Sequence, residues 1–138
     1  MMDENILEIH SYTGPGYVPQ VDYGTWRVAV LNYCETPESI EKTEKHNETD
    51  EVFILTRGKA VLFVGDGPAR PNCLYPQIME IGVIYNVKKA IWHTVVLSRD
   101  ASILIVENRD TGEKNSDYAS LTPDEHRLIL TTAKQVGI

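Results

Sequence analysis

The sequence of 138 residues has only two cysteines, Cys34 and Cys73, and no apolar run near the roughly 20 residues of a membrane span. Its first ten residues are acidic where a secretory signal would be basic. Two cysteines without a framework of spacings predict free thiols in a reducing compartment. We therefore expect a cytoplasmic protein that is not inserted in a membrane.

Basic residues are also scarce, because 13 Lys and Arg stand against 20 Asp and Glu, a formal net charge of -7 at pH 7. Nucleic-acid-binding proteins present clustered Lys and Arg, and this sequence has no such cluster, so we expect no nucleic-acid partner. Many acidic residues fall between Glu35 and Glu51, where a solvated loop is the simple interpretation. The length and the 42% hydrophobic content predict one globular domain over residues 1–138.

Short apolar segments follow one another closely and are separated by turn residues, which is typical of an all-β sandwich or barrel. We expect the barrel to occupy residues 6–108 approximately, with turns at residues 14–16 and at Pro19. A loop is expected over residues 36–48, with a short helical turn at residues 37–42 as the alternative. The expected strands are Ile6–Tyr12, Trp26–Cys34, Glu51–Arg57, Lys59–Val64, Leu74–Ile81, Val83–Val87, Trp92–Leu97 and Ser102–Asn108.

The end of the chain has a different pattern. Residues 122–125, Thr-Pro-Asp-Glu, form a capping box with proline at the first helical position. An apolar stripe follows, so the sequence predicts a helix from about Pro123 to Gln135 that packs on the outside of the barrel.

Two distant segments carry the candidate site. Glu44 and His46 are two residues apart, so their side chains leave an extended segment on the same side. Glu51 shares a strand face with Phe53 and Leu55, and burying a carboxylate on such a face is costly unless it is paired or binds a metal.

His93 shares its face with apolar residues in the second segment. Alone it would be interpreted as a core histidine with a satisfied hydrogen bond. Together with His46 and Glu51, it favours a site for a divalent transition metal. A buried cluster of hydrogen-bonded His and Glu without metal is the alternative.

The two segments resemble the paired motifs of the cupin superfamily. The first motif contains His-x-His, a Glu after three or four residues, and a Gly after six more. Here Glu44 replaces the first His, while His46, Glu51 and Gly58 match.

The second motif is a Gly, then Pro-x-Gly after five residues, a His after two more, and an Asn after a further three. Gly82 and His93 match this pattern, whereas Lys88, Ala90 and Leu97 replace the Pro, Gly and Asn. The spacing of both motifs is kept, although the residue identities are kept only in part.

This resemblance implies a double-stranded β-helix, or jelly-roll barrel, with Glu44, His46, Glu51 and His93 as metal ligands. A Glu in place of a His favours Mn, Fe or Zn over copper. It also implies an enzyme of the isomerase, epimerase or lyase type, similar to sugar-isomerase-like and ureidoglycolate-lyase-like cupins. The substrate would be a small polar metabolite such as a sugar or a hydroxy or oxo acid.

Further residues are candidates for the pocket and the chemistry. Trp92, Tyr33 and Tyr85 are candidates to line the pocket. Arg57 would bind an acidic substrate, because guanidinium pairs with carboxylate through two hydrogen bonds. Glu44 is the candidate for moving a proton if it does not bind metal.

Several alternatives stay open at this point. Glu107 is a second candidate acid or base, although a surface position is the favoured interpretation. Two His and one Glu also form the facial triad of non-haem iron oxygenases. A ligand-binding protein with a degenerate, metal-free pocket would be non-catalytic. Under each of these interpretations we expect a homodimer, because strands such as 52–56 and 102–106 are apolar on both faces.

Overall fold

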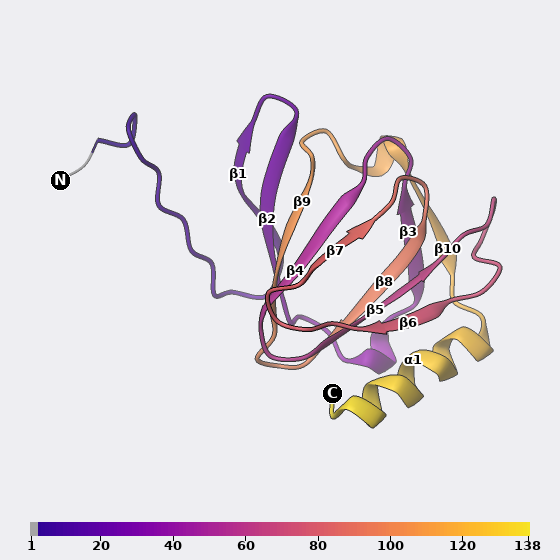
Figure 1. Ribbon diagram of the computed structural model, residues 1–138. Coiled ribbons are helices and arrows are strands. Elements are labelled where there is room, and N and C mark those ends of the chain that lie inside the picture. Colours follow the sequence, from indigo (N-terminus) through magenta and orange to yellow (C-terminus); the bar gives the residue numbers. More distant parts are fainter. Residues whose placement is uncertain (1–2) are drawn as a thin grey trace.

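Two five-stranded antiparallel sheets pack face to face in the computed structural model, which describes residues 3–138 (Figure 1). The first sheet has the strand order β1-β2-β9-β4-β7, and the second has the order β10-β3-β8-β5-β6. The strands of the first sheet are β1 (Gly16–Tyr23), β2 (Trp26–Asn32), β9 (Ser102–Asn108), β4 (Glu51–Arg57) and β7 (Ile84–Val87). Those of the second are β10 (Ser116–Ser120), β3 (Lys42–His46), β8 (Trp92–Leu97), β5 (Ala60–Gly65) and β6 (Tyr75–Ile78).

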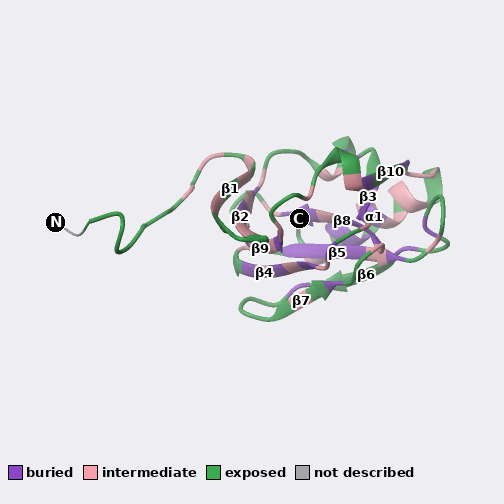
Figure 2. Ribbon diagram, turned by 90° about the horizontal axis from the view of Figure 1, so that it is seen from above, coloured by how far each residue is buried: buried purple, intermediate pink, exposed green. Residues whose placement is uncertain are grey.

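The main hydrophobic core lies between the two sheets and follows from the alternation of the strands. Phe53 and Leu55 of β4 point inward and are at most 2% exposed, beside Ile103 and Ile105 of β9. The second sheet meets them with residues such as Leu62 of β5. Figure 2 shows β5 as buried, whereas β6 and most connections are exposed. The all-β jelly-roll architecture expected from the sequence is confirmed.

A helix, α1 (Pro123–Val136), covers the outer face of the second sheet. Thr122 accepts a hydrogen bond from the Glu125 amide, and the Glu125 carboxylate accepts one from the Thr122 amide, which completes the capping box. Ile129 and Ala133 then pack on β5 residues such as Phe63. The predicted helix is therefore confirmed to within one residue at its end.

Some local predictions were wrong. Residues 6–12 form no strand, because none of the described sheets offers them a pairing partner, and they extend away from the body as an exposed arm (Figures 1 and 2). The turn expected at residues 14–16 is present as a bend at Gly14 and Pro15, whereas Pro19, where a second turn was expected, lies within β1. Pro19 is accommodated there because the register of β1 against β2 shifts between Pro19 and Val21.

The sheets also extend further along the chain than expected. The polar segment 36–48 was expected to be a loop, but it contains a short 3-10 turn (Pro37–Ser39) and then β3. β3 pairs with β10, which lies after the predicted end of the barrel at about residue 108. A second 3-10 turn (Glu113–Asn115) leads into β10. In the described part of the chain, no helix is long and apolar enough to cross a membrane.

Candidate metal centre and its cavity

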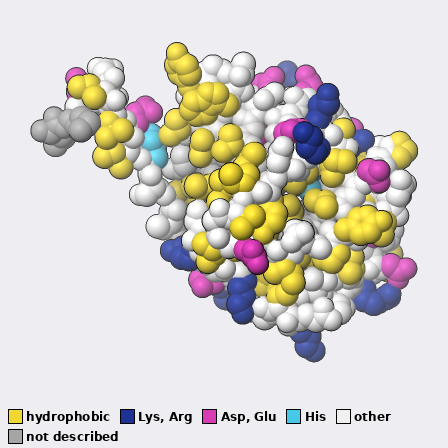
Figure 3. Space-filling model, in the orientation of Figure 1, with side chains coloured by type: hydrophobic (Ala, Val, Ile, Leu, Met, Phe, Trp, Pro, Cys, Tyr) yellow, Lys and Arg dark blue, Asp and Glu magenta, His cyan; other side chains and the backbone are white. Residues whose placement is uncertain are grey.

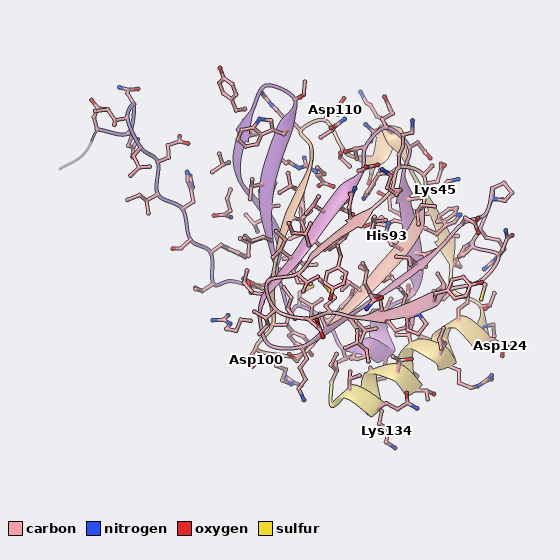
Figure 4. All side chains as sticks on the ribbon, in the orientation of Figure 1. Lys45, His93, Asp100, Asp110, Asp124 and Lys134 are labelled. Carbon is pink, nitrogen blue, oxygen red and sulfur yellow. The ribbon has the colours of Figure 1, made fainter. Side chains whose placement is uncertain are left out.

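Four side chains from the two motif segments meet inside the barrel. Glu44 and His46 come from β3, Glu51 begins β4, and His93 lies in β8, where Figure 4 shows it among the strands. His93 Nε2 lies 2.8 Å from Glu51 Oε1, and His46 Nε2 lies 3.5 Å from the same oxygen. Glu44 Oε1 lies 3.8 Å from Nε2 of both histidines. The structure thus brings together all four residues that the resemblance indicates.

Local structure explains this convergence. β3 and β8 pair with Glu44 directly opposite His93. The turn at residues 47–50 is held because Asp50 accepts hydrogen bonds from the Lys89 amide and the Asn86 side chain. The turn reverses the chain so that Glu51 enters β4 facing inward, opposite Val87 of β7. The turn at residues 47–50 therefore aims Glu51 back toward His46.

Three of the four side chains are withdrawn from water. His46, Glu51 and His93 are at most 9% exposed, whereas 43% of the Glu44 side chain is exposed. All four line a cavity of about 660 Å³ between the sheets. A pocket of that size is in the range that holds small molecules.

Hydrogen bonds fix how the two imidazoles face the cavity. His93 Nδ1 lies 3.0 Å from the carbonyl oxygen of Ile91, which can only accept, so Nδ1 carries the hydrogen. His46 Nδ1 bonds to the Ser116 hydroxyl at 2.7 Å. Each ring therefore presents Nε2 to the carboxylates, and a hydrogen bond at the opposite nitrogen is the usual support of a metal-binding histidine.

The closest pair has no hydrogen bond to account for it. Glu51 Oε1 and His93 Nε2 are both buried, and neither makes a hydrogen bond although they are 2.8 Å apart. In a neutral His93, two lone pairs would face each other across this distance. A proton or a metal ion between the two atoms removes that repulsion. Two imidazole nitrogens with carboxylate oxygens are ligands that suit Mn, Fe or Zn, so the residues fit a divalent transition metal.

The charges of the cluster favour ion pairing. Burial raises the pKa of Glu51, but the imidazoles of His46 and His93 more than offset it and hold the pKa below its usual range. Burial lowers the pKa of each histidine, yet the neighbouring Glu51 raises it above the usual value. The cluster therefore retains an anionic carboxylate at its centre.

Glu107 is part of this cluster, contrary to the surface position that was favoured. Only 2% of its side chain is exposed, and Oε1 accepts hydrogen bonds from Tyr17 and Arg27. Ligand atoms of His46, Glu51 and Glu107 all lie within 4.8 Å of one another. Burial, and then the nearby Glu51, raises the pKa of Glu107 to about 7.

Arg27 is a residue of the site that the sequence analysis did not select. Its guanidinium donates to Glu107 at 2.7 Å, to the Tyr17 hydroxyl, and to the carbonyl oxygens of Arg109 and Thr111. It thereby joins β1, β2, β9 and the following loop behind the cluster. The signal was present in the sequence, because an arginine sharing a face with Ala29 needs a buried partner.

Of the four remaining candidate residues, the structure places one in the wall of the cavity and three outside it. Tyr33 lines the cavity, whereas Trp92, Tyr85 and Arg57 do not. The Trp92 indole donates to Gly67, and the Tyr85 hydroxyl accepts from the Glu80 amide. Arg57 is exposed and donates to the carbonyl oxygen of Asp100, which Figure 4 shows at the end of the barrel away from His93. The glycine turn after Arg57 carries it there, so it does not provide an anchor for an acidic substrate in this cavity.

Solved structures provide the comparison with known proteins. A cupin-2 domain-containing protein from Shewanella frigidimarina is 20% identical, with a TM-score of 0.53 over 70% of this chain and 85% of that one. Hydroxypropylphosphonic acid epoxidase from S. wedmorenis is 14% identical, with a TM-score of 0.53 over 67% of this chain and 49% of that one. This chain spans about half the length of the epoxidase. No family model and no curated protein matches the sequence.

These likenesses show the fold: the chain has a jelly-roll β-barrel similar to that of the cupin-2 domain-containing protein. The expected resemblance is thus confirmed at the level of fold. Within that fold, the particular feature of this protein is a candidate metal centre made of two histidines and neighbouring glutamates.

Proposed function

We propose that the protein is a metal-dependent cupin enzyme that binds one divalent transition ion through His46, His93, Glu51 and Glu44. The observation that carries this proposal is the convergence of two imidazole Nε2 atoms on one buried carboxylate oxygen: those of His93 and His46 lie 2.8 Å and 3.5 Å from Glu51 Oε1. The ion would be Mn, Fe or Zn. One of the similar structures, that of the epoxidase, was solved as an Fe(II) form.

The proposed chemistry is isomerisation, epimerisation or lyase chemistry on a small polar metabolite. A bound divalent ion would supply Lewis acidity toward an oxygen of the substrate. The protein's own residues divide the remaining work. Glu51 and the histidines hold the ion, and Glu44, the most exposed of the four, accepts and returns a proton at the cavity when it is not itself bound to the ion.

Metal titration tests this function. Chelator-treated protein should take up one equivalent of Mn(II), Zn(II) or anaerobic Fe(II), measured by calorimetry and elemental analysis. The His93→Ala variant should lose at least a hundredfold in affinity, because one of few ligands is gone. The His10→Ala variant is the matched control, because His10 lies in the exposed arm. Less than about a tenth of an equivalent bound by the parent would contradict the proposal.

A second candidate is a non-catalytic ligand-binding protein whose His–Glu cluster is purely structural. The substituted positions of the second motif, Lys88, Ala90 and Leu97, favour it. The Glu51→Gln variant separates the two proposals. Loss of metal uptake with the fold retained supports the enzyme. Severe destabilisation of a protein that never bound metal supports the structural cluster.

We also propose that the protein is a homodimer that packs through the outer face of the first sheet. The register aligns apolar residues across that face in two rows, Val30-Leu104-Ile54-Ile84 and Val28-Val106-Val52. Helix α1 covers only the other sheet. Figure 3 shows apolar side chains gathered over β1, β2, β9 and β4.

A second copy of the chain is the occupant that these features favour. An apolar sheet face packs readily on an equivalent face, as in β-sandwiches. The exposed arm that leads into this sheet at β1 carries the apolar residues Ile6 and Ile9, which are 77% and 86% exposed. Sedimentation should show a dimer at micromolar concentration and a monomer for Ile54→Lys. Gln77→Lys in β6 of the other sheet is the control. A monomeric parent would contradict this proposal.

A further inference from the structure

The inward-facing side chains of four strands change from polar to apolar along the barrel. On β2, β4, β8 and β9, the change starts from a residue of the polar cluster: Arg27, Glu51, His93 and Glu107. The next two inward positions on these strands are, in the same order, Ala29 and Leu31, Phe53 and Leu55, Val95 and Leu97, and Ile105 and Ile103. All of these side chains are apolar and have no hydrogen-bonding group.

Strand pairing arranges these positions in layers across the first sheet. Ile105 pairs with Ala29 on one side and with Phe53 on the other. A second layer is formed in the same way by Ile103, Leu31 and Leu55. Successive layers lie about 7 Å apart, since two residues of a strand rise by about 3.4 Å each. The metal centre therefore lies directly above two apolar layers.

The cavity extends from the metal centre into both apolar layers. Phe53, Ile105 and Val95 line it at the level of the first layer, and Leu31 and Leu97 line it at the level of the second. Leu31 and Val95 pack against the core between the sheets, yet they are only partly buried. Because both face inward and line the cavity, their uncovered apolar surface faces the cavity. Covering such surface with an apolar group of a ligand is favourable.

The polar residues elsewhere in the lining do not interrupt these layers. The charged ones outside the cluster are exposed to solvent: Glu35, Glu41, Lys42 and Glu113. Thr94 points to the opposite face of β8 from Val95, because side chains alternate along a strand. The Asn32 amide already donates to the carbonyl oxygens of Tyr12 and Gly14. Beyond the metal centre, the inward faces of the four strands therefore offer a ligand apolar contacts rather than hydrogen bonds.

We infer that the natural ligand is amphipathic: an oxygen-bearing head reaches the metal centre, and a hydrocarbon or aromatic group lies against Val95, Phe53 and Leu31. This inference rests on the proposed function for the metal centre, and it narrows the substrate class. It favours hydroxy or oxo compounds that carry a hydrocarbon group over sugars, which are polar along their whole length.

A series of probes with one metal-binding head and different tails tests the inference. Acetohydroxamate, butanohydroxamate and 3,4-dihydroxybutanohydroxamate should be titrated calorimetrically into Zn(II)-loaded protein, with their affinities for free Zn(II) as the reference for the head alone. We expect butanohydroxamate to bind about tenfold more tightly than acetohydroxamate, because two additional methylenes are buried. The dihydroxy probe has the same carbon chain, but it should bind no more tightly than acetohydroxamate, because its hydroxyl groups lose their hydrogen bonds to water.

Metal-free protein provides a test that does not depend on the ion. Cyclohexanol should shift the methyl NMR signals of Leu31 and Val95, because its ring can cover their uncovered surface. Glycerol at the same concentration should leave these signals unchanged.

Two matched variants locate the tail in the cavity. Val95→Thr exchanges a methyl group for a hydroxyl group at nearly constant volume. It should lower the ratio of butanohydroxamate to acetohydroxamate affinity by about threefold. Val64→Thr is the control, because Val64 is also partly buried against the core but does not line the cavity. Its affinity ratio should equal that of the parent. A ratio measured within one variant is independent of how much of that variant is folded.

The other outcomes contradict either the inference or the proposed function. Equal binding of acetohydroxamate and butanohydroxamate, or equal binding of the dihydroxy probe and butanohydroxamate, would overturn the inference even if metal uptake is normal. A tail preference that Val95→Thr leaves unchanged would also overturn it. If Val95→Thr does not fold, the parent series and the methyl signals decide. Failure of the parent to take up metal would contradict the proposed function instead, and the cyclohexanol experiment would still test the apolar site.

Discussion

The amide of Ala90 donates a 2.8 Å hydrogen bond to the carbonyl oxygen of His46, which ties the turn before β8 to the end of β3. Ala90 adopts a φ of 63°, the left-handed region that favours glycine. The cupin motif that this segment resembles has glycine here. The chain therefore keeps the turn that places His93 although it lacks the residue best suited to it.

Replacing Ala90 with glycine should consequently stabilise the protein. Relief of the left-handed strain exceeds the entropy that glycine adds to the unfolded chain, so we expect a gain of about 1 kcal/mol. Urea unfolding measures this change. Gly82→Ala is the matched control, since Gly82 has a φ of +82° with open space around a Cβ, and it should lose a comparable amount. Destabilisation by Ala90→Gly would show that the turn is not strained.

The hydrogen bond between His46 and Ser116 should support metal binding without contributing a ligand. Ser116→Ala removes the partner of His46 Nδ1 and leaves the ring free to rotate. We expect metal affinity to fall by about 10- to 100-fold, as for other supporting partners of metal-binding histidines. Calorimetric titration measures the loss. Ser120→Ala, on the same strand but exposed, should bind metal like the parent.

Arg27 and Arg57 should respond very differently to replacement by lysine. Only 16% of the Arg27 side chain is exposed, and it satisfies four oxygens, which a lysine cannot reach together. We expect Arg27→Lys to cost about 2 kcal/mol of unfolding free energy. Arg57→Lys changes an exposed side chain and should cost less than about 0.5 kcal/mol. Thermal unfolding compares them, and equal effects would contradict the structural role of Arg27.

The parts of the fold that the sequence predicted are those with a local signal. β4 and β9 alternate inward and outward apolar residues, and α1 begins with a capping box. β3 and β10 escaped prediction because they are mostly polar and are defined by pairing with each other across 70 residues, as with His46 and Ser116. β1 was missed because Pro19 suggested a turn, whereas it lies at a shift in register.

The candidate site was predicted in the same uneven way. The motif spacing identified Glu44, His46, Glu51 and His93, which the structure brings together. Glu107 was assigned to the surface because it lies near the end of its strand. Glu107 lies on the same face of its strand as Ile103 and Ile105, which are both buried. That shared face correctly indicates a buried position for Glu107. No sequence pattern predicts where the Arg57 side chain points, because its direction depends on the turn that follows it.

Glu107 should give the stability of the metal-free protein a characteristic pH dependence. Its pKa is raised from 4.5 to about 7 by burial and by Glu51. As the pH rises through this window, the unfolded chain loses the proton while the folded protein keeps it. The folded state then binds more protons, so the free energy of unfolding falls with rising pH. The difference between a pKa of 4.5 in the unfolded chain and about 7 in the folded protein corresponds to about 3 kcal/mol of unfolding free energy.

The Glu107→Gln variant isolates this effect because its amide replaces the neutral acid. Its oxygen can still accept from Tyr17 and Arg27, and its nitrogen can donate toward Glu51. The raised pKa values of the histidines add stability below about pH 6.5 that is lost as the pH rises, and the lowered pKa of Glu51 adds stability above about pH 4.5. These contributions occur in both proteins and cancel in the comparison to a first approximation.

The difference in unfolding free energy between Glu107→Gln and the parent should therefore be small near pH 4.5. It should grow to about 3 kcal/mol in favour of the variant by pH 8, because only the parent must then hold a second ionised carboxylate beside Glu51. Urea unfolding at several pH values in the presence of chelator measures it. A difference that stays constant with pH would mean that Glu107 is ionised throughout, and Arg27 would then neutralise it completely.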